Sequence, residues 1–183
     1  TAANARAAAS LDPTNATKAA DAATATAAAT AAIAGDTQIG QEQWAFIPSF
    51  VMPNLYRLAD KKYRDNHRYY IDSSPIVGDV CTANCSNAGT AVWKTILVGG
   101  LGRGGRGYYA LDITDPANPK ALWEFSDTNM GYTYGPPQIG KLSDGTWVVL
   151  LSSGYNNIAN DDGAGGDGVG RLYVVKAADG TQI

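Results

Sequence analysis

The chain has 183 residues, of which 45% are hydrophobic and 17% charged, with 21 glycines. This composition excludes a charge-rich disordered chain and a coiled coil, and it favours a turn-rich globular body. The formal net charge of −3 provides no store of positive charge for a phosphate backbone, so nucleic acid is not expected as a partner. No apolar run approaches the roughly 18 residues that a membrane helix needs, and we expect no transmembrane segment.

Both ends of the chain are interpreted as cuts through a larger protein. The first residue is Thr1 rather than Met, and the last residues, 181–183, follow an Asp-Gly turn signal as the expected start of another strand. No basic stretch followed by an apolar stretch opens the chain, so any export signal is expected to have been removed or to lie outside it.

Residues 1–38 differ in composition from everything that follows. Eighteen of the first 35 residues are Ala, and most of the others are Thr, Asn, Asp or Ser. There is no stripe of large apolar residues with which a helix could dock. We expect a low-complexity insertion or linker, and a helix that docks on a partner is the alternative.

Residues 39–183 carry short apolar bursts separated by Gly, Pro, Asn and Asp, a pattern typical of short strands and tight turns. One short helix is predicted over residues 53–60, where Leu55 and Leu58 share a face and Pro53 fits the first turn. The predicted strands are residues 43–47, 69–71, 76–80, 93–98, 107–114, 121–125, 138–142, 146–152 and 171–177.

Internal repeats indicate how these strands are arranged. The strand that starts at Tyr109 is matched by the one that starts at Tyr173, and the strand of Trp93 is matched by that of Trp147. A Trp-x-Phe strand, at Trp44 and again at Trp123, precedes each copy. The prediction is an all-β fold, a partial β-propeller of about two to three blades of four antiparallel strands, with tryptophans at the seams between blades.

Several sequence phrases after residue 40 resemble the C-terminal β-propeller of PilC/PilY-type type IV pilus tip adhesins and biogenesis proteins. They are residues 44–49 (WAFIPS), 67–75 (HRYYIDSSP), 93–102 (WKTILVGGLG), 104–112 (GGRGYYALD) and 130–137 (MGYTYGPP). The resemblance implies a seven-bladed, quinoprotein-like propeller in an exported protein at the outer membrane surface or pilus tip. It also implies a non-enzymatic role in adhesion, pilus assembly and control of retraction, with minor pilins or host-surface receptors as partners.

The glycine-rich stretch at residues 100–107 fits the dinucleotide-binding pattern G-x-G-x-x-G twice. Such a site needs a helix to begin there, whereas residues 108–113 alternate like a strand. We therefore predict a wide, flexible hairpin loop between two strands of a blade. Arg103 and Arg106 remain candidates for gripping an anion on a partner surface.

Cys81 and Cys85 are the chain's two cysteines and lie in a polar loop between predicted strands. Zinc would need two more ligands, and the sole histidine, His67, lies in a distant charged stretch. In an exported protein, a disulfide that closes the hairpin tip is the better interpretation.

The most acidic loop, residues 156–167, invites a calcium assignment through Asn160, Asp161, Asp162 and Asp167. Neither alternating register provides three oxygen side chains, so we expect a mobile hairpin without a specific calcium site. The family resemblance does imply a calcium loop, which we place in a later blade beyond Ile183. No cofactor is expected within this chain.

No catalytic residue is predicted, because His67 has no serine or cysteine nucleophile in a recognisable motif. A pyrroloquinoline-quinone-dependent dehydrogenase is the enzymatic alternative, since that cofactor chemistry also occurs on propellers, but Cys81 and Cys85 are not the adjacent pair those enzymes use. A purely structural scaffold is the third possibility. Four tyrosines in polar loops are available either for contact with a partner or for packing: Tyr63, Tyr132, Tyr134 and Tyr155.

Overall fold

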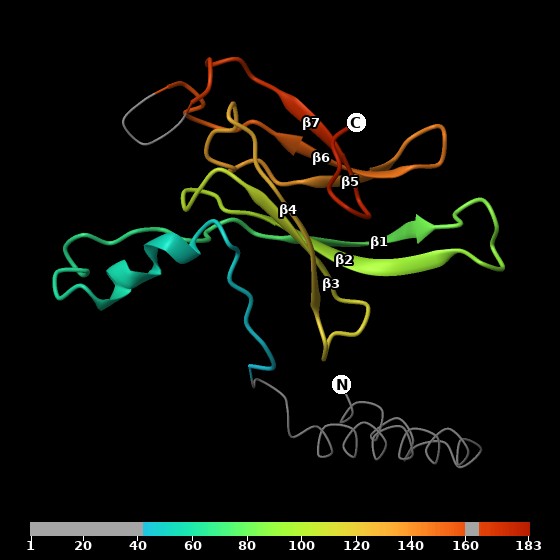
Figure 1. The fold of residues 1–183 in the computed structure, drawn as a ribbon, viewed down its shortest axis with the longest axis horizontal. Coiled ribbons are helices and arrows are strands. Elements are labelled where there is room, and N and C mark those ends of the chain that lie inside the picture. The colour runs from blue at the N-terminus through green and yellow to red at the C-terminus, as the bar shows by residue number, and fades with distance from the viewer. Residues whose placement is uncertain (1–41, 160–164) are drawn as a thin grey trace, which may run out of the picture. The chain divides into compact units, whose positions relative to one another are not determined.

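The computed structural model of the chain describes residues 42–159 and 165–183 (Figure 1). The predicted insertion, residues 1–38, and its boundary with the propeller segment lie outside the described residues. Phe46–Ile183 form one structural unit, and its regular structure is almost entirely antiparallel β-sheet. Within the described ranges, no helix is long and apolar enough to cross a membrane.

The first sheet has four strands in the order β1-β2-β3-β4, all antiparallel. Its strands are β1 (Ile76–Ala83), β2 (Val92–Gly100), β3 (Tyr108–Asp112) and β4 (Lys120–Phe125). The registers of β1 and β4 each shift by one residue where they meet their neighbours. The two inner strands, β2 and β3, hold most of the buried residues of this sheet.

The second sheet contains β5 (Gln138–Lys141), β6 (Trp147–Ser152) and β7 (Leu172–Lys176) in that order. After β7 the chain turns at Gly180, whose φ is +72°. Residues 181–183 then return beside β7, where the Lys176 N–H donates to Thr181 O at 2.8 Å and the Ile183 N–H donates to Val174 O at 2.9 Å. A fourth position of this sheet is thus paired, and it is occupied by residues 181–183 instead of by the predicted Trp123 strand.

One hydrophobic core fills the space between the two sheets. It contains Val80, Ile96, Val98, Tyr108, Ala110 and Trp123 from the first sheet, and Met130, Val149, Leu151, Tyr173, Val175 and Ala177 from the second sheet and its flanks. Side-chain hydrogen bonds also join the two sheets. The Trp123 indole N–H donates to Ala177 O at 3.0 Å, and the Tyr108 hydroxyl donates to Gly135 O at 3.0 Å.

A second, smaller core covers the opposite face of the first sheet. Val51, Leu101, Tyr109 and Leu111 are buried there, and Phe46, Phe50 and Tyr70 pack against them. The predicted helix is present as the 3₁₀ helix η2 (Met52–Ala59), with Pro53 in its first turn. None of its side chains is fully buried.

Two of the predicted strands, residues 43–47 and 69–71, are not strands. In the first, Phe46 packs its ring on Tyr109 at 5.4 Å, and Pro48, which is buried and has no N–H to donate to a ladder, follows. In the second, the Tyr70 hydroxyl donates to Asn54 O at 3.1 Å, so the segment is fixed by side chains. In both cases apolar residues cover a sheet face without joining a ladder.

The predicted grouping of strands into repeats is also corrected. The Trp123 strand, β4, is the last strand of the first sheet and not the first strand of the next. The physical reason is loop length: the short β3–β4 turn permits antiparallel pairing of neighbours, whereas the longer connection from Phe125 to Gln138 crosses to the second sheet. Three of the tryptophans mark the seam: Trp123 lies in the core between the sheets, and the Trp93 and Trp147 rings meet edge to face at 5.7 Å.

Candidate ligand-binding groove

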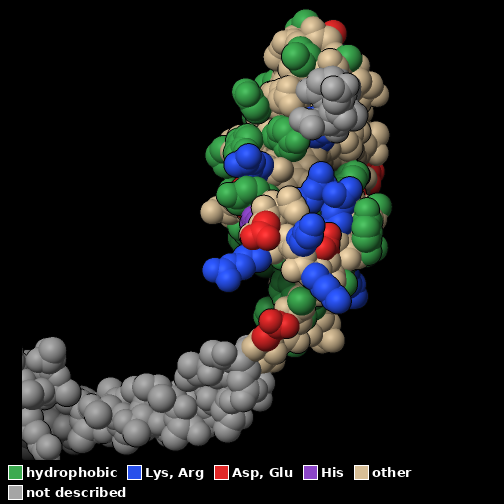
Figure 2. All heavy atoms as spheres, turned by 90° about the vertical axis from the view of Figure 1, so that its left-hand side faces the viewer, with side chains coloured by type: hydrophobic (Ala, Val, Ile, Leu, Met, Phe, Trp, Pro, Cys, Tyr) green, Lys and Arg blue, Asp and Glu red, His purple; other side chains and the backbone are tan. Residues whose placement is uncertain are grey.

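A groove of about 1260 Å³ lies at one end of the two sheets. Three connections contribute to it: the β2–β3 loop, the β4–β5 connection and the β6–β7 connection. Residues 67–69, which precede β1, complete the lining together with Phe50 and Asn54. Figure 2 shows Lys and Arg side chains gathered on the side of the molecule that carries helix η2 and the β6–β7 connection.

The glycine-rich loop joins β2 directly to β3, and no helix begins in it. The geometry that a dinucleotide site requires is therefore missing, as the sequence predicts. The loop is fastened at both ends: the Leu101 N–H donates to Gly107 O at 3.2 Å, and the Arg103 N–H donates to Asp72 Oδ1 at 2.6 Å. A Cβ at Gly104 would collide with the backbone of Tyr70, so a side chain there would displace the loop.

Thr133, in the β4–β5 connection, bonds to both ends of the same loop. This fully buried side chain accepts a hydrogen bond from the Leu101 N–H at 2.9 Å and donates one to Gly107 O at 3.0 Å. The sequence predicts a flexible loop, whereas its two ends, Leu101 and Gly107, are joined by hydrogen bonds to each other and to Thr133.

The arginines of the loop stack on tyrosines of the groove. The Arg103 guanidinium lies 5.0 Å from the Tyr69 ring centre, and that of Arg106 lies 4.6 Å from the Tyr132 ring centre. Such cation–π contacts hold each guanidinium over the face of its tyrosine ring. Arg68 is a third arginine of the lining.

The opposite wall is formed where Tyr132 and Tyr155 pair through their backbones. The Tyr155 N–H donates to Tyr132 O at 3.1 Å, and the Tyr132 N–H donates to Tyr155 O at 2.6 Å. Between them, Gly154 has a φ of +71°, and a Cβ there would collide with the Tyr132 carbonyl. This close backbone approach places the rings of Tyr134 and Tyr155 at the groove surface, 51% and 71% exposed.

Asp127 is the single carboxylate among the described residues that line the groove. It accepts a hydrogen bond from the Asn129 N–H at 2.8 Å and one from the Tyr173 hydroxyl at 2.9 Å. These bonds lower the pKa of Asp127, the Asn129 bond contributing most, so the group is ionised at neutral pH. Burial and the bond to Asp127 raise the pKa of Tyr173 to about 12.

The sequence candidates are partly brought together here. Arg103, Arg106, Tyr132, Tyr134, Tyr155 and His67 all line the groove. Tyr63 does not: it packs against the His67 ring at 5.5 Å. His67 also contacts Tyr69 at 5.2 Å, so it supports the aromatic wall.

Sequence reasoning missed several lining residues, among them Arg68, Tyr69 and Asp127. Tyr69 begins a segment predicted as a strand, Arg68 directly precedes that segment, and Asp127 is the second residue after the end of β4. One signal was available: strands of an antiparallel sheet alternate in direction, so every second connection shares an end. This rule places the connections after β2, β4 and β6 at the same end of the sheets.

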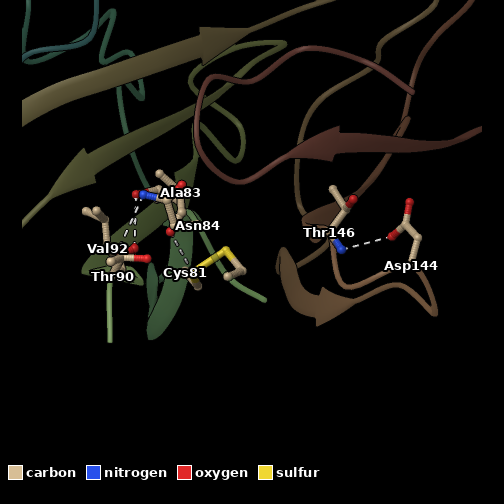
Figure 3. Close-up of a disulfide and its surroundings, with 9 residues drawn as sticks. Cys81, Ala83, Asn84, Thr90, Val92, Asp144 and Thr146 are labelled. Atoms are coloured by element: carbon tan, nitrogen blue, oxygen red, sulfur yellow. Dashed lines mark hydrogen bonds between the residues drawn. A yellow bond between two sulfur atoms is a disulfide. The ribbon is translucent and has the colours of Figure 1, made fainter. Parts of the chain in front are cut away.

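The opposite end of the sheets carries the disulfide. Cys81 and Cys85 are bonded to each other, with their Cα atoms 5.7 Å apart. Figure 3 shows the disulfide at the tip of the β1–β2 hairpin, where Asn84 Nδ2 donates to Thr90 O, and it shows the β5–β6 turn with Asp144 and Thr146 beside it. A hollow of about 440 Å³ separates these two turns.

Of the acidic loop, Asn160, Asp161 and Asp162 lie outside the described residues. Asp167 pairs with Arg171, whose Nη1 and Nη2 each donate to the carboxylate at 2.7 Å. This bidentate pair lowers the pKa of Asp167. The described ranges contain no group of three or more His, Cys, Asp or Glu residues that could hold a metal ion.

Comparison with known proteins adds the family. A model of the family described as the PilY1 beta-propeller domain matches residues 13–182. Type IV pilus biogenesis factor PilY1 of Pseudomonas aeruginosa strain PAO1 is 39% identical over 129 residues, which cover 68% of this chain and 10% of that protein. A PilY1 homolog of Xylella fastidiosa strain Temecula1 is 39% identical over 131 residues, covering 70% of this chain and 10% of the homolog.

The crystal structure of the Pseudomonas aeruginosa PilY1 C-terminal domain resembles the fold described above. It matches with a TM-score of 0.53 and 33% sequence identity over 78% of this chain and 25% of that one. The match confirms the predicted partial β-propeller. The chain spans about a tenth of the length of the curated relatives.

Proposed function

The chain belongs to the PilY1 beta-propeller domain family, and on that premise we propose that it serves the type IV pilus system as a non-enzymatic binding module. The family match carries this proposal, because the relatives are named type IV pilus biogenesis factors. The groove supports it, since loops at one end of a rigid sheet stack are where propellers bind partners.

The finer role that we propose is contact with partners at the outer membrane surface or pilus tip, in adhesion, pilus assembly and control of retraction. Minor pilins and host-surface receptors are the partners that such a role requires. The exposed tyrosines and stacked arginines of the groove are the residue types that recur in protein recognition sites.

Nothing in the site favours the dehydrogenase alternative. Cys81 and Cys85 are not adjacent, and their disulfide closes a hairpin at the end of the sheets opposite the groove. A purely structural scaffold would need no exposed groove. Substitutions of groove residues can therefore distinguish a scaffold from a binding module.

The test is genetic. Deletion of the gene in the bacterium that encodes it should abolish surface pili and twitching motility, and the full-length gene should restore both. A complementing gene with Arg103→Gln and Arg106→Gln should restore pili yet leave attachment to surfaces or host cells weakened. Normal piliation and motility in the deletion strain would contradict a role in the pilus system.

A further inference from the structure

We propose that the groove binds an acidic, extended peptide segment of a partner protein, with Arg68 and Arg103 pairing to its carboxylates. The inference deepens the proposed function and rests on it, since it names the chemistry that the binding module recognises. It follows from the charge, the side-chain geometry and the size of the groove.

The charge of the groove opposes that of the chain. The described lining residues include three arginines and one carboxylate, whereas the whole chain has a formal net charge of −3. Neither Arg68 nor Arg103 forms an ion pair with a carboxylate within residues 42–159 and 165–183. Concentrating positive charge in one hollow of an acidic surface attracts anionic groups to that hollow.

The geometry of Arg103 suits a carboxylate. Its main chain is held by Asp72, and its guanidinium lies against the Tyr69 ring. Because part of the side-chain motion is already restricted, less entropy is lost when the planar N–H fork pairs with two carboxylate oxygens. A lysine at this position would present a point charge without that fork.

The aromatic wall suits a chain segment. Tyr134 and Tyr155 are more than half exposed, and Tyr69 is 45% exposed. Tyrosine rings offer large apolar contact areas with few rotatable bonds, and their hydroxyls can bond to peptide groups. Exposed rings beside arginines therefore provide both anchors and charge partners for a peptide.

The size of the groove and its single carboxylate favour a peptide over a small molecule or a sulfated polysaccharide. The groove, at about 1260 Å³, exceeds the ~300–1,000 Å³ of typical small-molecule pockets and is open to solvent. The ionised Asp127 lies among the lining residues, so a uniformly sulfated polysaccharide would bring sulfates close to it. A peptide has carboxylates at discrete positions and can place neutral groups there.

The experiment measures fluorescence anisotropy with the purified full-length protein. The probe is a fluorescein-labelled twelve-residue peptide that alternates Glu and Ser, and its neutral counterpart has Gln in place of Glu. Saturable binding of the Glu peptide, weakened by added salt, together with at least about tenfold weaker binding of the Gln peptide, is the expected result.

Variants place the binding in the groove. Arg68→Gln with Arg103→Gln should weaken binding of the Glu peptide by about tenfold or more. The control pair, Lys61→Gln with Arg64→Gln, removes the same charge from exposed residues outside the groove lining and should leave binding within about twofold. Unchanged circular dichroism shows that both variants remain folded.

Three outcomes would overturn the proposal: no saturable binding of the Glu peptide, an equal loss in the control pair, or heparin that binds more tightly through the same arginines. The last would assign the groove to a polysaccharide. Absence of peptide binding, with pili lost in the deletion strain, removes this inference alone. Normal piliation with peptide binding intact removes the proposed pilus role alone.

Discussion

The hydroxyl of Tyr173 donates a hydrogen bond of 2.9 Å to Oδ1 of Asp127. Tyr173 lies on β7, within the core between the two sheets, while Asp127 lies in the β4–β5 connection and lines the groove. The bond therefore attaches a groove loop to the most buried part of the molecule. Its contribution to the free energy of unfolding can be measured by substituting either residue.

Tyr173→Phe should lower the free energy of unfolding at pH 7 by about 1 kcal/mol. This is the contribution expected of one hydrogen bond to a carboxylate that is partly exposed to solvent. The folded pKa of Tyr173, about 12, lies above its ordinary value of 10.0. The stabilisation by the neutral hydroxyl is thus complete below pH 10 and is lost as pH rises toward 12.

Chemical unfolding at pH 7 and at pH 11 measures this effect. The variant should lose less stability than the parent over that interval. Tyr155→Phe, which changes a ring that is 71% exposed, is the control and should match the parent. Equal alkaline losses in parent and Tyr173→Phe would show that the bond does not contribute.

Thr133→Val should loosen the glycine-rich loop, because it removes the hydroxyl that bonds to both Leu101 and Gly107. The expected cost is about 1 kcal/mol, since the Leu101 N–H keeps its second bond, to Gly107 O. Hydrogen exchange of the peptide that spans residues 101–107 should accelerate in the full-length protein. Thr133→Ser keeps the hydroxyl and should restore slow exchange; a loop equally protected in all three proteins would contradict this account.

Asp112→Asn should make the first sheet less sensitive to acid. The bond from the Thr114 hydroxyl contributes most to lowering the pKa of Asp112 to about 2, and Lys94 lies 3.0 Å away. Because this folded value is below the ordinary 3.8, the stabilisation is present above about pH 4 and is lost as pH falls toward 2. Solvent screening reduces it to on the order of 1 kcal/mol.

Acid titration of the unfolding free energy from pH 6 to pH 2 tests this assignment. The Asp112→Asn protein should be less stable than the parent at pH 6 and nearly equal to it at pH 2. Asp65→Asn, in an exposed turn outside both sheets, is the charge-matched control. A constant difference between Asp112→Asn and the parent across the range would exclude the titration of this carboxylate as the cause.

The disulfide predicts that unreduced protein has no titratable thiol. Reduction, or replacement of Cys81 and Cys85 by Ser, should cost about 2 kcal/mol or less, because the cysteines are only four residues apart and their bond closes a very short loop. The loss should be local, with faster exchange at the β1–β2 tip. Two reactive thiols in the native protein would contradict the bonded pair.

Most strands that form the sheets could be predicted from sequence because their apolar bursts, bounded by turn residues, coincide with segments that pair with a neighbour. β2 and β6 are examples, and their Trp93 and Trp147 meet at the seam. Residues 43–47 and 69–71 have similar apolar content but cover a sheet face with side chains such as Phe46. Local composition cannot separate these two uses of an apolar segment, because the difference lies in the partner.

Some residues of the groove could be predicted from sequence, but their arrangement into one groove could not. Arg103 and Arg106 were visible as charged residues in a glycine-rich loop, and three of its tyrosines as polar-loop aromatics. Their meeting depends on which connections share an end of the sheets, which follows from strand order and not from spacing along the chain. Asp127 carried no sequence signal of its own, since its bond to Tyr173 spans 46 residues.

The separation between strands and connections has an evolutionary consequence. The core side chains, such as Val98 and Val149, lie on strands, whereas Arg103 and Tyr155 lie on loops. Substitutions in the loops can change which ligand is recognised without disturbing the packing that keeps the blades together. Duplicated copies of such a domain are thus free to diverge in specificity while their folding remains under unchanged selection.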